Sequence, residues 1–520
     1  MDEERFWVDQ EALEVVKARG KKSSYICEAG ITPSGPKHIG NFREIITVDM
    51  IVQSLRDLGK KVKFQYVWDS YDRFRKVPAD VPKNKIKLME GEIGKPVCDV
   101  LDPWGCHDSW AEHWMSKLEA EVALTGIKPE YLRQHELYRK GVYADSIKCA
   151  LNHRDKIINV LNQYRKEPLV NDWWPVFIYC EICGKDSTKI KSYDGMYELS
   201  YDCACGHHDL IDFRKKGLVK LRWRVDWPMR WAFYGVDFEP AGKEHMVMGS
   251  SRTTGEIIVK NVFGSEPPYA FMYGLVRGKG GPGKMSASKG NVIFVSDALK
   301  VYLPSVLRFI FMGNRVSSDF PISFDEDVLK IYEDFYQCER AYYGVACDLS
   351  AKRSAHLKRV YEFCVAKPSK KIPAQLSFRT AALIAQTTIE GEWFKRAGNV
   401  VKTVKSDEPR VKFLIKAAQH WVEVHAPEGY KIVINDGSSK IKLSKKVKIV
   451  LKELGDLLLS ESFSEEELGR IIFEHARKIG VKDFFKAIYQ VIISKDKGPR
   501  LAQFIKTVGQ ERIGKLLSDL

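Results

Sequence analysis

The spacing of apolar residues along the first seventy positions predicts a strand, a helix and a second strand in close succession. Residues 24–28 form a short apolar run typical of a buried strand, and a Gly- and Pro-rich segment follows it. From 42 to 58 the apolar side chains recur at the spacing of one helix face, and Gly59 stands where a C-cap is expected. Residues 62–68 are the next strand candidate. This order predicts a βαβ unit within a parallel sheet.

The pattern changes after this unit. Residues 77–175 mix helical patterns, at 110–125 and 143–164, with Pro-containing connectors, which indicates an inserted region. Strand-like alternation returns at 218–224, and helical patterns dominate from about 297 onward. The sequence therefore predicts an α/β region that is interrupted by an insertion and followed by a helical region.

Length and composition agree with several soluble domains. The chain has 520 residues, of which 44% are hydrophobic, which is too long for one compact domain. Its apolar stretches are short and broken by charge, so no membrane span is expected. The start of the chain is acidic and lacks an apolar signal region, which predicts a cytoplasmic protein. The 11 cysteines are expected to be thiols or metal ligands rather than a disulfide framework.

The positive charge is concentrated in the last third of the chain. Residues 331–520 carry 34 Lys and Arg against 23 Asp and Glu, whereas the first 330 residues carry 49 against 45. A solvated basic surface explains this excess equally well by itself. If a nucleotide site lies upstream in the same chain, a module that binds a polyanion becomes the better interpretation.

A turn between the first strand and the first helix is a candidate phosphate site. A loop at this position offers free N–H groups and the positive end of the helix dipole, and glycine lets the backbone approach a ligand closely. His38 can donate to phosphate oxygens. By itself, a Gly/Pro turn with one histidine is more often a plain loop. The residues assigned to the site are Pro33, Ser34, Gly35, His38, Gly40 and Asn41.

A second segment, about 245 residues downstream, supports the nucleotide interpretation. A Gly-rich run at 278–283 precedes it, so we expect a loop that can close over a triphosphate. Two lysines supply positive charge and two serines supply hydroxyl donors. The residues assigned to ATP are Lys284, Met285, Ser286 and Ser288, and the catalytic assignments are His38, Lys284 and Lys289.

In this order the two segments resemble the H-I-G-H and K-M-S-K-S motifs of class I aminoacyl-tRNA synthetases. Further blocks are similar to the class I lysyl-tRNA synthetases in particular. They lie at 30–35, 41–44, 68–78, 102–107, 221–231 and 237–243, with His245. The resemblance covers roughly residues 24–315 and implies a lysine–tRNA ligase that activates L-lysine with ATP and transfers it to tRNA(Lys) without a covalent enzyme intermediate.

The two motifs depart from the usual pattern. Asn41 stands at the last position of the first motif, and Ala287 stands where the second usually has lysine. Lys284 or Lys289 is then expected to provide the charge of this loop. For lysine itself, binding requires polar or anionic groups for the ammonium and aromatic packing for the methylenes. The candidates are Glu28, Gly30, Asp69, Trp223, Asp226 and His245, although buried Asp and Trp residues often serve only the core.

Two groups of residues are candidate zinc sites. Cys180, Cys183, Cys203 and Cys205 have the spacing of two knuckles, and four thiolates suit a closed structural site. His207 is an alternative fourth ligand. The resemblance also implies a second zinc at Asp102, Cys106, His107 and His113, with Cys98 as a competing ligand. Magnesium is expected with ATP.

The resulting fold class is α/β: a Rossmann-like parallel-sheet catalytic domain with a zinc-bearing insertion and an all-α C-terminal domain. The resemblance implies the catalytic domain at 1–80 and 215–295, an acceptor-end and zinc-binding region at 81–214, a connecting stem-contact region at 296–345 and an α-helical anticodon-binding domain at 346–520. For the oligomeric state, a monomer is the working expectation.

Two alternatives remain open at this point. A relative that charges glutamate would need cationic groups near the side chain, and the acidic and aromatic character around Asp226 and Glu244 argues against it. A non-catalytic RNA-binding paralogue would be supported by degraded motifs or by loss of the C-terminal region. In this chain the two motifs and the C-terminal region are present.

Overall fold

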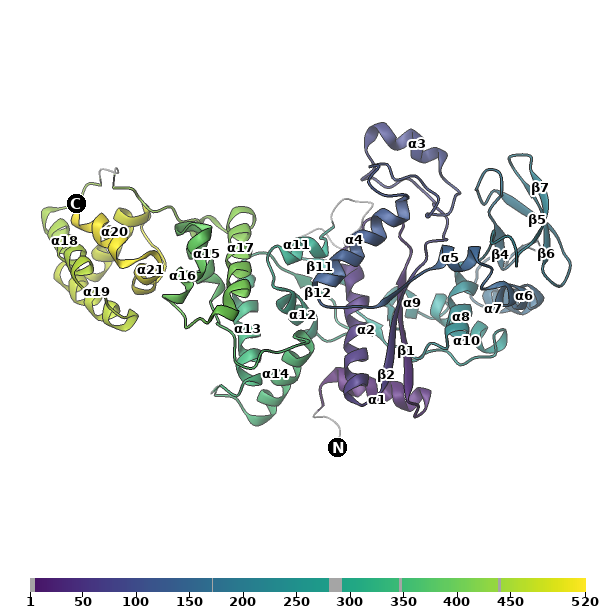
Figure 1. Ribbon diagram of the computed structural model, residues 1–520, viewed down its shortest axis with the longest axis horizontal. Coiled ribbons are helices and arrows are strands. Elements are labelled where there is room, and N and C mark those ends of the chain that lie inside the picture. The colour runs from purple at the N-terminus through teal and green to yellow at the C-terminus, as the bar shows by residue number, and fades with distance from the viewer. Residues whose placement is uncertain (1–4, 171, 280–291, 346–347, 438–440) are drawn as a thin grey trace. The chain divides into compact units, whose positions relative to one another are not determined.

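The chain forms two compact units in the computed structural model, which describes residues 5–170, 172–279, 292–345, 348–437 and 441–520 (Figure 1). One unit consists of Met1–Ala298 and Ile310–Ile322, and the other of Leu299–Phe309 and Ser323–Leu520. The predicted division into four regions is finer than these two units and stays a prediction.

The first unit is built around a parallel sheet, as the sequence predicts. β1 (Ser24–Ile31) pairs with β2 (Lys61–Trp68), and β2 pairs with β3 (Glu130–Arg133), all in parallel. At the other edge of β1, parallel bridges join Cys27 to Phe238 and Phe238 to Tyr269. The sheet therefore combines an early and a late part of the chain, and its strand β3 comes from within the residues predicted to be inserted, which corrects that boundary.

The helix between the two first strands is α2 (Ile39–Asp57), which packs on β1 and β2 and is itself covered by α1 (Trp7–Arg19) (Figure 1). The predicted strand–helix–strand unit is confirmed. The helix begins three residues earlier than predicted because His38 caps it. Gly59 follows the C-cap with φ of 74°, a left-handed conformation that glycine adopts easily.

The inserted region combines short helices with small antiparallel sheets. The predicted helix at 143–164 is two helices, because the chain leaves helical geometry at His153 (φ −108°, ψ 22°). The strand-like stretch 218–224 forms a strand of only three residues before a helix starts at Trp223. The elements are α3 (Ile86–Gly91), α4 (Trp110–Leu124), α5 (Gln134–Arg139), α6 (Ala144–Asn152), α7 (Arg154–Asn162), β4 (Val176–Ile178), β5 (Thr188–Tyr193), β6 (Glu198–Cys203), β7 (His208–Asp212) and β8 (Val219–Leu221).

After the insertion the chain returns to the parallel sheet. A buried cluster that includes Tyr71, Ile178 and Met229 joins the insertion to the helix that follows it. The strands β9 and β10 pair in parallel, as do β11 and β12. The elements are α8 (Trp223–Tyr234), β9 (Ala241–Gly242), α9 (Lys243–Met246), α10 (Ser251–Asn261), β10 (Met272–Tyr273), β11 (Val276–Gly278), α11 (Val295–Leu299), α12 (Pro304–Met312) and β12 (Phe320–Ile322).

The second unit is helical, which confirms the prediction for this part of the chain. A continuous apolar core that includes Leu454, Ile488 and Phe504 joins its last five helices. Its helices are α13 (Asp327–Tyr342), α14 (Ala351–Cys364), α15 (Phe378–Thr387), α16 (Trp393–Gly398), α17 (Glu408–Val424), α18 (Lys445–Ser460), α19 (Glu465–Ile479), α20 (Val481–Ile493), α21 (Leu501–Val508) and α22 (Gln510–Ser518). Within the described ranges, none of the chain's helices combines the length and the apolar character that crossing a bilayer requires.

Candidate active site

The first sequence motif forms the turn between β1 and α2. His38 is the N-cap of α2: its Nδ1 accepts a hydrogen bond from the Gly40 N–H at 3.0 Å, and Asn41 Oδ1 accepts one from the His38 N–H at 3.0 Å. This reciprocal capping holds the imidazole at the positive end of a 19-residue helix. Because Nδ1 accepts, a neutral ring carries its proton on Nε2, which can donate to an anion at the helix terminus.

The flanks of the second motif lie beside the first, although Lys284, Met285, Ser286, Ala287, Ser288 and Lys289 themselves fall outside the described residues. On one flank, β11 contacts α2, and Gly278 faces the Ile293 side chain. On the other flank, the Ile293 carbonyl accepts a hydrogen bond from the Ile39 N–H at 2.8 Å. The fold therefore brings Gly278 and Ile293, which lie on either side of residues 280–291, to the start of α2.

A cavity of about 280 Å³ opens between the start of α2, α8 and the strands β9 and β10. Gly30 has no room for a side chain, since an added Cβ would lie 2.7 Å from the Val67 carbonyl oxygen. Residues that line this cavity, called here the central cavity, include Gly30, His38, Gly40, Asn41, Glu44, Trp223, Trp227, Arg230, Glu239, Glu244, His245 and Tyr273.

A second cavity of about 430 Å³ adjoins the first. It shares Gly30, Trp223 and His245 with the central cavity and adds Ser34 and Asp69. Of the other motif residues, Pro33 and Gly35 lie in the turn before His38 without lining either cavity. An added Cβ on Gly35 would meet no atom within 4 Å.

The central cavity has an acidic wall. Burial raises the pKa of Glu44 well above its usual range and nearby Glu239 raises it further, while hydrogen bonds from the Gly30 N–H and from Tyr273 oppose the shift. Glu239 accepts hydrogen bonds from Trp227 Nε1 at 2.9 Å and from Trp231 Nε1. A carboxylate whose ionised form is disfavoured by burial gains stability when a cation binds beside it. This wall is therefore suited to an ammonium group.

Aromatic rings form another wall of both cavities. Trp223, in the first turn of α8, stacks on Trp227 with ring centroids 5.0 Å apart and an interplanar angle of 13°. The His245 ring lies 5.7 Å from Trp227 and accepts or donates a 2.7 Å hydrogen bond between Nδ1 and the Ser251 hydroxyl. These rings offer flat apolar surface to a hydrocarbon chain.

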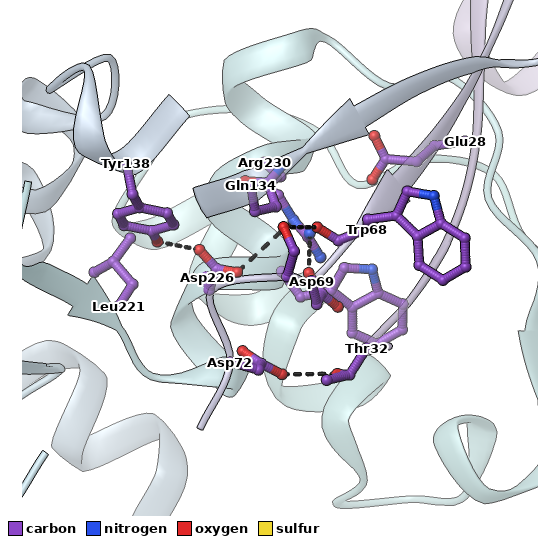
Figure 2. A network of polar contacts seen from close by, with 12 residues as sticks. Glu28, Thr32, Trp68, Asp69, Asp72, Gln134, Tyr138, Leu221, Asp226 and Arg230 are labelled. Carbon is purple, nitrogen blue, oxygen red and sulfur yellow. Dashed lines mark hydrogen bonds and ion pairs between the residues drawn. The ribbon is translucent and has the colours of Figure 1, made fainter. Parts of the chain in front are cut away.

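Figure 2 shows a buried polar network around Asp69, Asp226 and Arg230. Arg230, which lines the central cavity, donates a hydrogen bond to Asp69. Asp226 accepts one from the Tyr138 hydroxyl and forms a 2.9 Å ion pair with Lys220. Burial raises the pKa of Asp69 to about 7, and Arg230 opposes this shift. Although burial opposes it, Lys220 and Arg230 together lower the pKa of Asp226.

The six residues predicted to contact lysine thus fall into two groups. Gly30, Asp69, Trp223 and His245 line the two cavities. Glu28 and Asp226 line neither, and both are fully buried. The Glu28 carboxyl accepts a hydrogen bond from Gln65 Nε2, and burial, with Glu239, raises its pKa to about 8.

Sequence reasoning missed Glu44 and Tyr273, the hydrogen-bonded pair on the acidic wall. A signal for Glu44 exists: His38, Asn41 and Glu44 follow one another at intervals of three, so they share one face of the helix. Tyr273 belongs to a strand of two residues, and nothing in its local sequence marks it.

The four predicted cysteines meet at one point of the insertion. Cys180 and Cys205 have Sγ atoms 3.7 Å apart, and Cys183 and Cys203 have theirs 3.6 Å apart. Thiolates at about 2.3 Å from a tetrahedral zinc are about 3.8 Å apart, so the four sulfurs fit that geometry. His207 instead groups with Glu181 and Asp209. The cysteine cluster can hold a metal ion such as zinc.

The second predicted cluster also comes together, at the start of α4. Cys106 Sγ lies 3.2 Å from His107 Nδ1, 3.3 Å from His113 Nδ1 and 3.3 Å from an Asp102 carboxylate oxygen. These groups form a mixed sulfur, nitrogen and oxygen set of the kind that binds zinc. Cys98 is not in this group, because its thiol contacts the Asp99 carboxylate instead.

Comparisons with known proteins agree with this geometry. The family described as tRNA synthetases class I (K) matches residues 5–367. A lysine–tRNA ligase from Pyrococcus horikoshii is 40% identical over 98% of this chain and 99% of the relative. Relatives with the same name from Borreliella burgdorferi and Methanocaldococcus jannaschii are 39% and 33% identical, over 98% and 97% of this chain and 98% of each relative.

Proposed function

The chain belongs to the class I tRNA synthetases of the lysine type, and from this premise we propose that it joins L-lysine to the 3′ end of tRNA(Lys). The family has tRNA, ATP and an amino acid as its substrates. The observation that carries lysine as the amino acid is the central cavity, which both the hydrogen-bonded pair Glu44 and Tyr273 and the stacked Trp223 line.

In this proposal the lysine ammonium binds at Glu44 and Tyr273, and its methylenes pack along Trp223 and His245. Arg230 is neutralised by Asp69, so it does not offer a free positive charge to an acidic side chain. This arrangement disfavours glutamate as the substrate. It leaves the lysine carboxylate directed toward the start of α2, where the triphosphate is expected.

ATP binds, in the same proposal, at the turn between β1 and α2. The His38 Nε2 proton and the α2 terminus stabilise charge on the phosphates as it develops. Lys284 and Lys289, which come shortly before Ile293 in the sequence, supply positive charge to the leaving pyrophosphate; Ile293 itself is hydrogen-bonded to Ile39 at this turn. Magnesium accompanies ATP and neutralises part of the phosphate charge.

The reaction proceeds in two displacements. A lysine carboxylate oxygen attacks the α-phosphorus, pyrophosphate leaves, and lysyl-adenylate forms. A terminal ribose hydroxyl of tRNA then attacks the carbonyl carbon of the adenylate, and AMP leaves. Because no side chain becomes a covalent intermediate, the residues act by position and by charge.

We assign structural zinc to Cys180, Cys183, Cys203 and Cys205, and a second zinc to Asp102, Cys106, His107 and His113. Four thiolates leave no open coordination position, so the first ion would hold the β5–β7 knuckles together rather than take part in the reaction. We assign the basic helical second unit to tRNA binding, at the anticodon.

Exchange of labelled pyrophosphate into ATP tests the activity. Wild-type exchange should depend on lysine and be absent with glutamate, and His38→Ala and Lys284→Ala should each slow it by about 10²–10³-fold, as loss of transition-state charge stabilisation does. Exchange with glutamate only would indicate the glutamate relative, and exchange with neither amino acid would indicate a non-catalytic paralogue. Near-normal rates in both variants would refute the site assignment.

A further inference from the structure

The residues that follow the second motif are held by two helices. Residues 293–297, called here the exit segment, lead from that motif into α11. The Ile293 carbonyl accepts a hydrogen bond from the Ile39 N–H at the start of α2. The exit segment also meets two side chains of α4, Lys117 and Glu121. It is therefore fixed both by the helix of the first motif and by α4.

The first contact with α4 is between a cation and an aromatic ring. The Lys117 ammonium lies 3.5 Å from the centroid of the Phe294 ring and 5.7 Å from that of Trp114. Lys117 is half-buried, so its ammonium has lost part of its hydration. A partly desolvated ammonium is attracted to an aromatic face more strongly than an exposed one. Lys117 therefore holds the Phe294 ring against α4.

The second contact lies one helical turn further along α4. Glu121 and Lys117 are four residues apart, so they share one face of this helix. Only 5% of Glu121 is exposed. Burial raises the pKa of Glu121, whereas interactions with the Ser296 hydroxyl and with the Lys117 ammonium oppose the shift. A buried carboxyl requires polar partners, and the partner from outside α4 belongs to the exit segment.

α4 gives these two side chains a firm support. The Ser109 hydroxyl caps the helix by accepting a hydrogen bond from the Glu112 N–H at 3.1 Å. Trp110, Leu118 and Val122 of the same helix are buried in the core. Side chains on a well-packed helix position a neighbouring segment more precisely than side chains on a loop. α4 is therefore suited to fix the exit segment in place.

We propose that Lys117 and Glu121 are positioning residues for lysine activation, because they hold the exit segment that follows the second motif. Lys284 and Lys289 come shortly before this segment in the sequence, so its position limits where they can meet the triphosphate. This inference rests on the proposed function, because it takes those lysines as the source of charge for the leaving pyrophosphate. Pyrophosphate leaves only in the first displacement, so the two residues serve activation and not transfer to tRNA.

A double-mutant cycle tests whether Lys117 acts through Phe294. Lys117→Met removes the ammonium, Phe294→Leu removes the ring, and both are compared with the double variant in the full chain. We expect each single variant to slow lysine-dependent pyrophosphate exchange about ten-fold, and the double variant to be no slower than either, because both changes remove one interaction. Transfer to tRNA(Lys) from chemically prepared lysyl-adenylate should keep its wild-type rate constant in all three.

Each other outcome of the cycle overturns the proposal. Normal exchange in Lys117→Met would mean that the ammonium has no role, and a slow Lys117→Met beside a normal Phe294→Leu would mean that Lys117 meets ATP directly. Multiplied effects in the double variant would make the two residues independent. Equal slowing of exchange and transfer would reduce the effect to a general disturbance of the fold. Lys128→Met, at an exposed position beyond α4, is the control and should exchange normally.

Glu121 has its own test. Glu121→Gln keeps the shape of the side chain and a polar partner for Ser296, so exchange should stay near the wild-type rate. Glu121→Leu and Ser296→Ala remove the contact from either side, and both should slow exchange while transfer stays unchanged. Normal exchange in these two variants would overturn the assignment of Glu121, and an equally slow Glu121→Gln would overturn its contact with Ser296 as the cause.

The same measurements separate this inference from the proposed function. If the wild-type chain showed no lysine-dependent exchange, the proposed function would fail. If the wild-type chain exchanged normally and the Lys117 and Glu121 variants did so too, only the positioning role would fail.

Discussion

Individual side chains at the start of α2 show how local spacing and tertiary contacts combine at the candidate active site. His38, Asn41 and Glu44 share one helix face, which their spacing already implies, but only the packing of β10 against β9 brings Tyr273 to Glu44. Glu28 illustrates the opposite case. It looks like a substrate ligand in the sequence, yet its strand places it inside the sheet beside Gln65.

Replacing the Glu44 carboxylate should weaken lysine binding. Glu44→Gln keeps the shape of the side chain and removes its charge, so we expect the KM for lysine to rise about 10- to 100-fold, the effect of losing a hydrogen bond to a charged group. Pyrophosphate exchange measured over a range of lysine concentrations checks this. Glu90→Gln, at an exposed position of the same unit, is the control. An unchanged KM would remove Glu44 from the lysine site.

The buried Glu28 should make stability depend on pH. Burial, with Glu239, raises its pKa from 4.5 to about 8, so the folded chain binds more protons than the unfolded chain between these values. The free energy of unfolding contributed by this group therefore falls as the pH rises through that window.

Glu28→Gln removes the titrating group and should gain stability relative to wild type as the pH is raised from about 5 to about 8.5, by on the order of 2–4 kcal/mol. Urea unfolding of both proteins at the two pH values measures this difference. A constant difference between wild type and Glu28→Gln would contradict a raised pKa, and Glu90→Gln should show no pH-dependent difference.

At the scale of elements, the sequence predicts helices and strands best where the apolar period continues over many residues. It predicts metal ligands best where they lie close together in the sequence. The strand–helix–strand unit and the two cysteine pairs are of this kind. The sequence does not predict the helix break at His153 or the shortness of β8, because apolar spacing continues through both. Only the surrounding packing determines where the chain turns.

Metal content tests the two clusters separately. We expect about two zinc ions per chain in wild type, and Cys205→Ser and Cys106→Ser should each lose about one, because a missing thiolate opens a closed ligand set. Elemental analysis of the purified full-length protein measures this. Cys149→Ser, whose thiol lies outside both clusters, should keep the wild-type content. Two ions remaining in either cluster variant would refute that assignment.

At the scale of the whole molecule, the catalytic sheet and the helical unit are products of different parts of the chain. The basic excess lies in residues 331–520, nearly all of the helical unit. The core of its last five helices is continuous and apolar, so the surplus lysines and arginines there are left to the surface, where a polyanion can reach them.

Charge reversal on α18 tests this surface. Lys445 and Lys446 are exposed, and Lys445→Glu with Lys446→Glu should raise the Kd for tRNA about ten-fold and flatten its dependence on salt, because fewer counterions are released on binding. Binding measured at several salt concentrations gives both quantities. Lys17→Glu with Lys21→Glu changes the charge of the first unit equally. If both double variants weakened binding alike, the helical unit would have no special role.

By itself, the sequence determined the parallel βαβ unit, the two motifs, the cysteine pairs and the helical second unit, because each depends on short-range periodicity or spacing. The tertiary structure decided which carboxylates face the cavities and which pair with buried cations. Asp69 meets Arg230 across 161 positions of sequence, and Asp226 meets Tyr138 across 88. Such pairs form only when strands and helices far apart in sequence pack together, so no local pattern distinguishes a ligand from a buried partner.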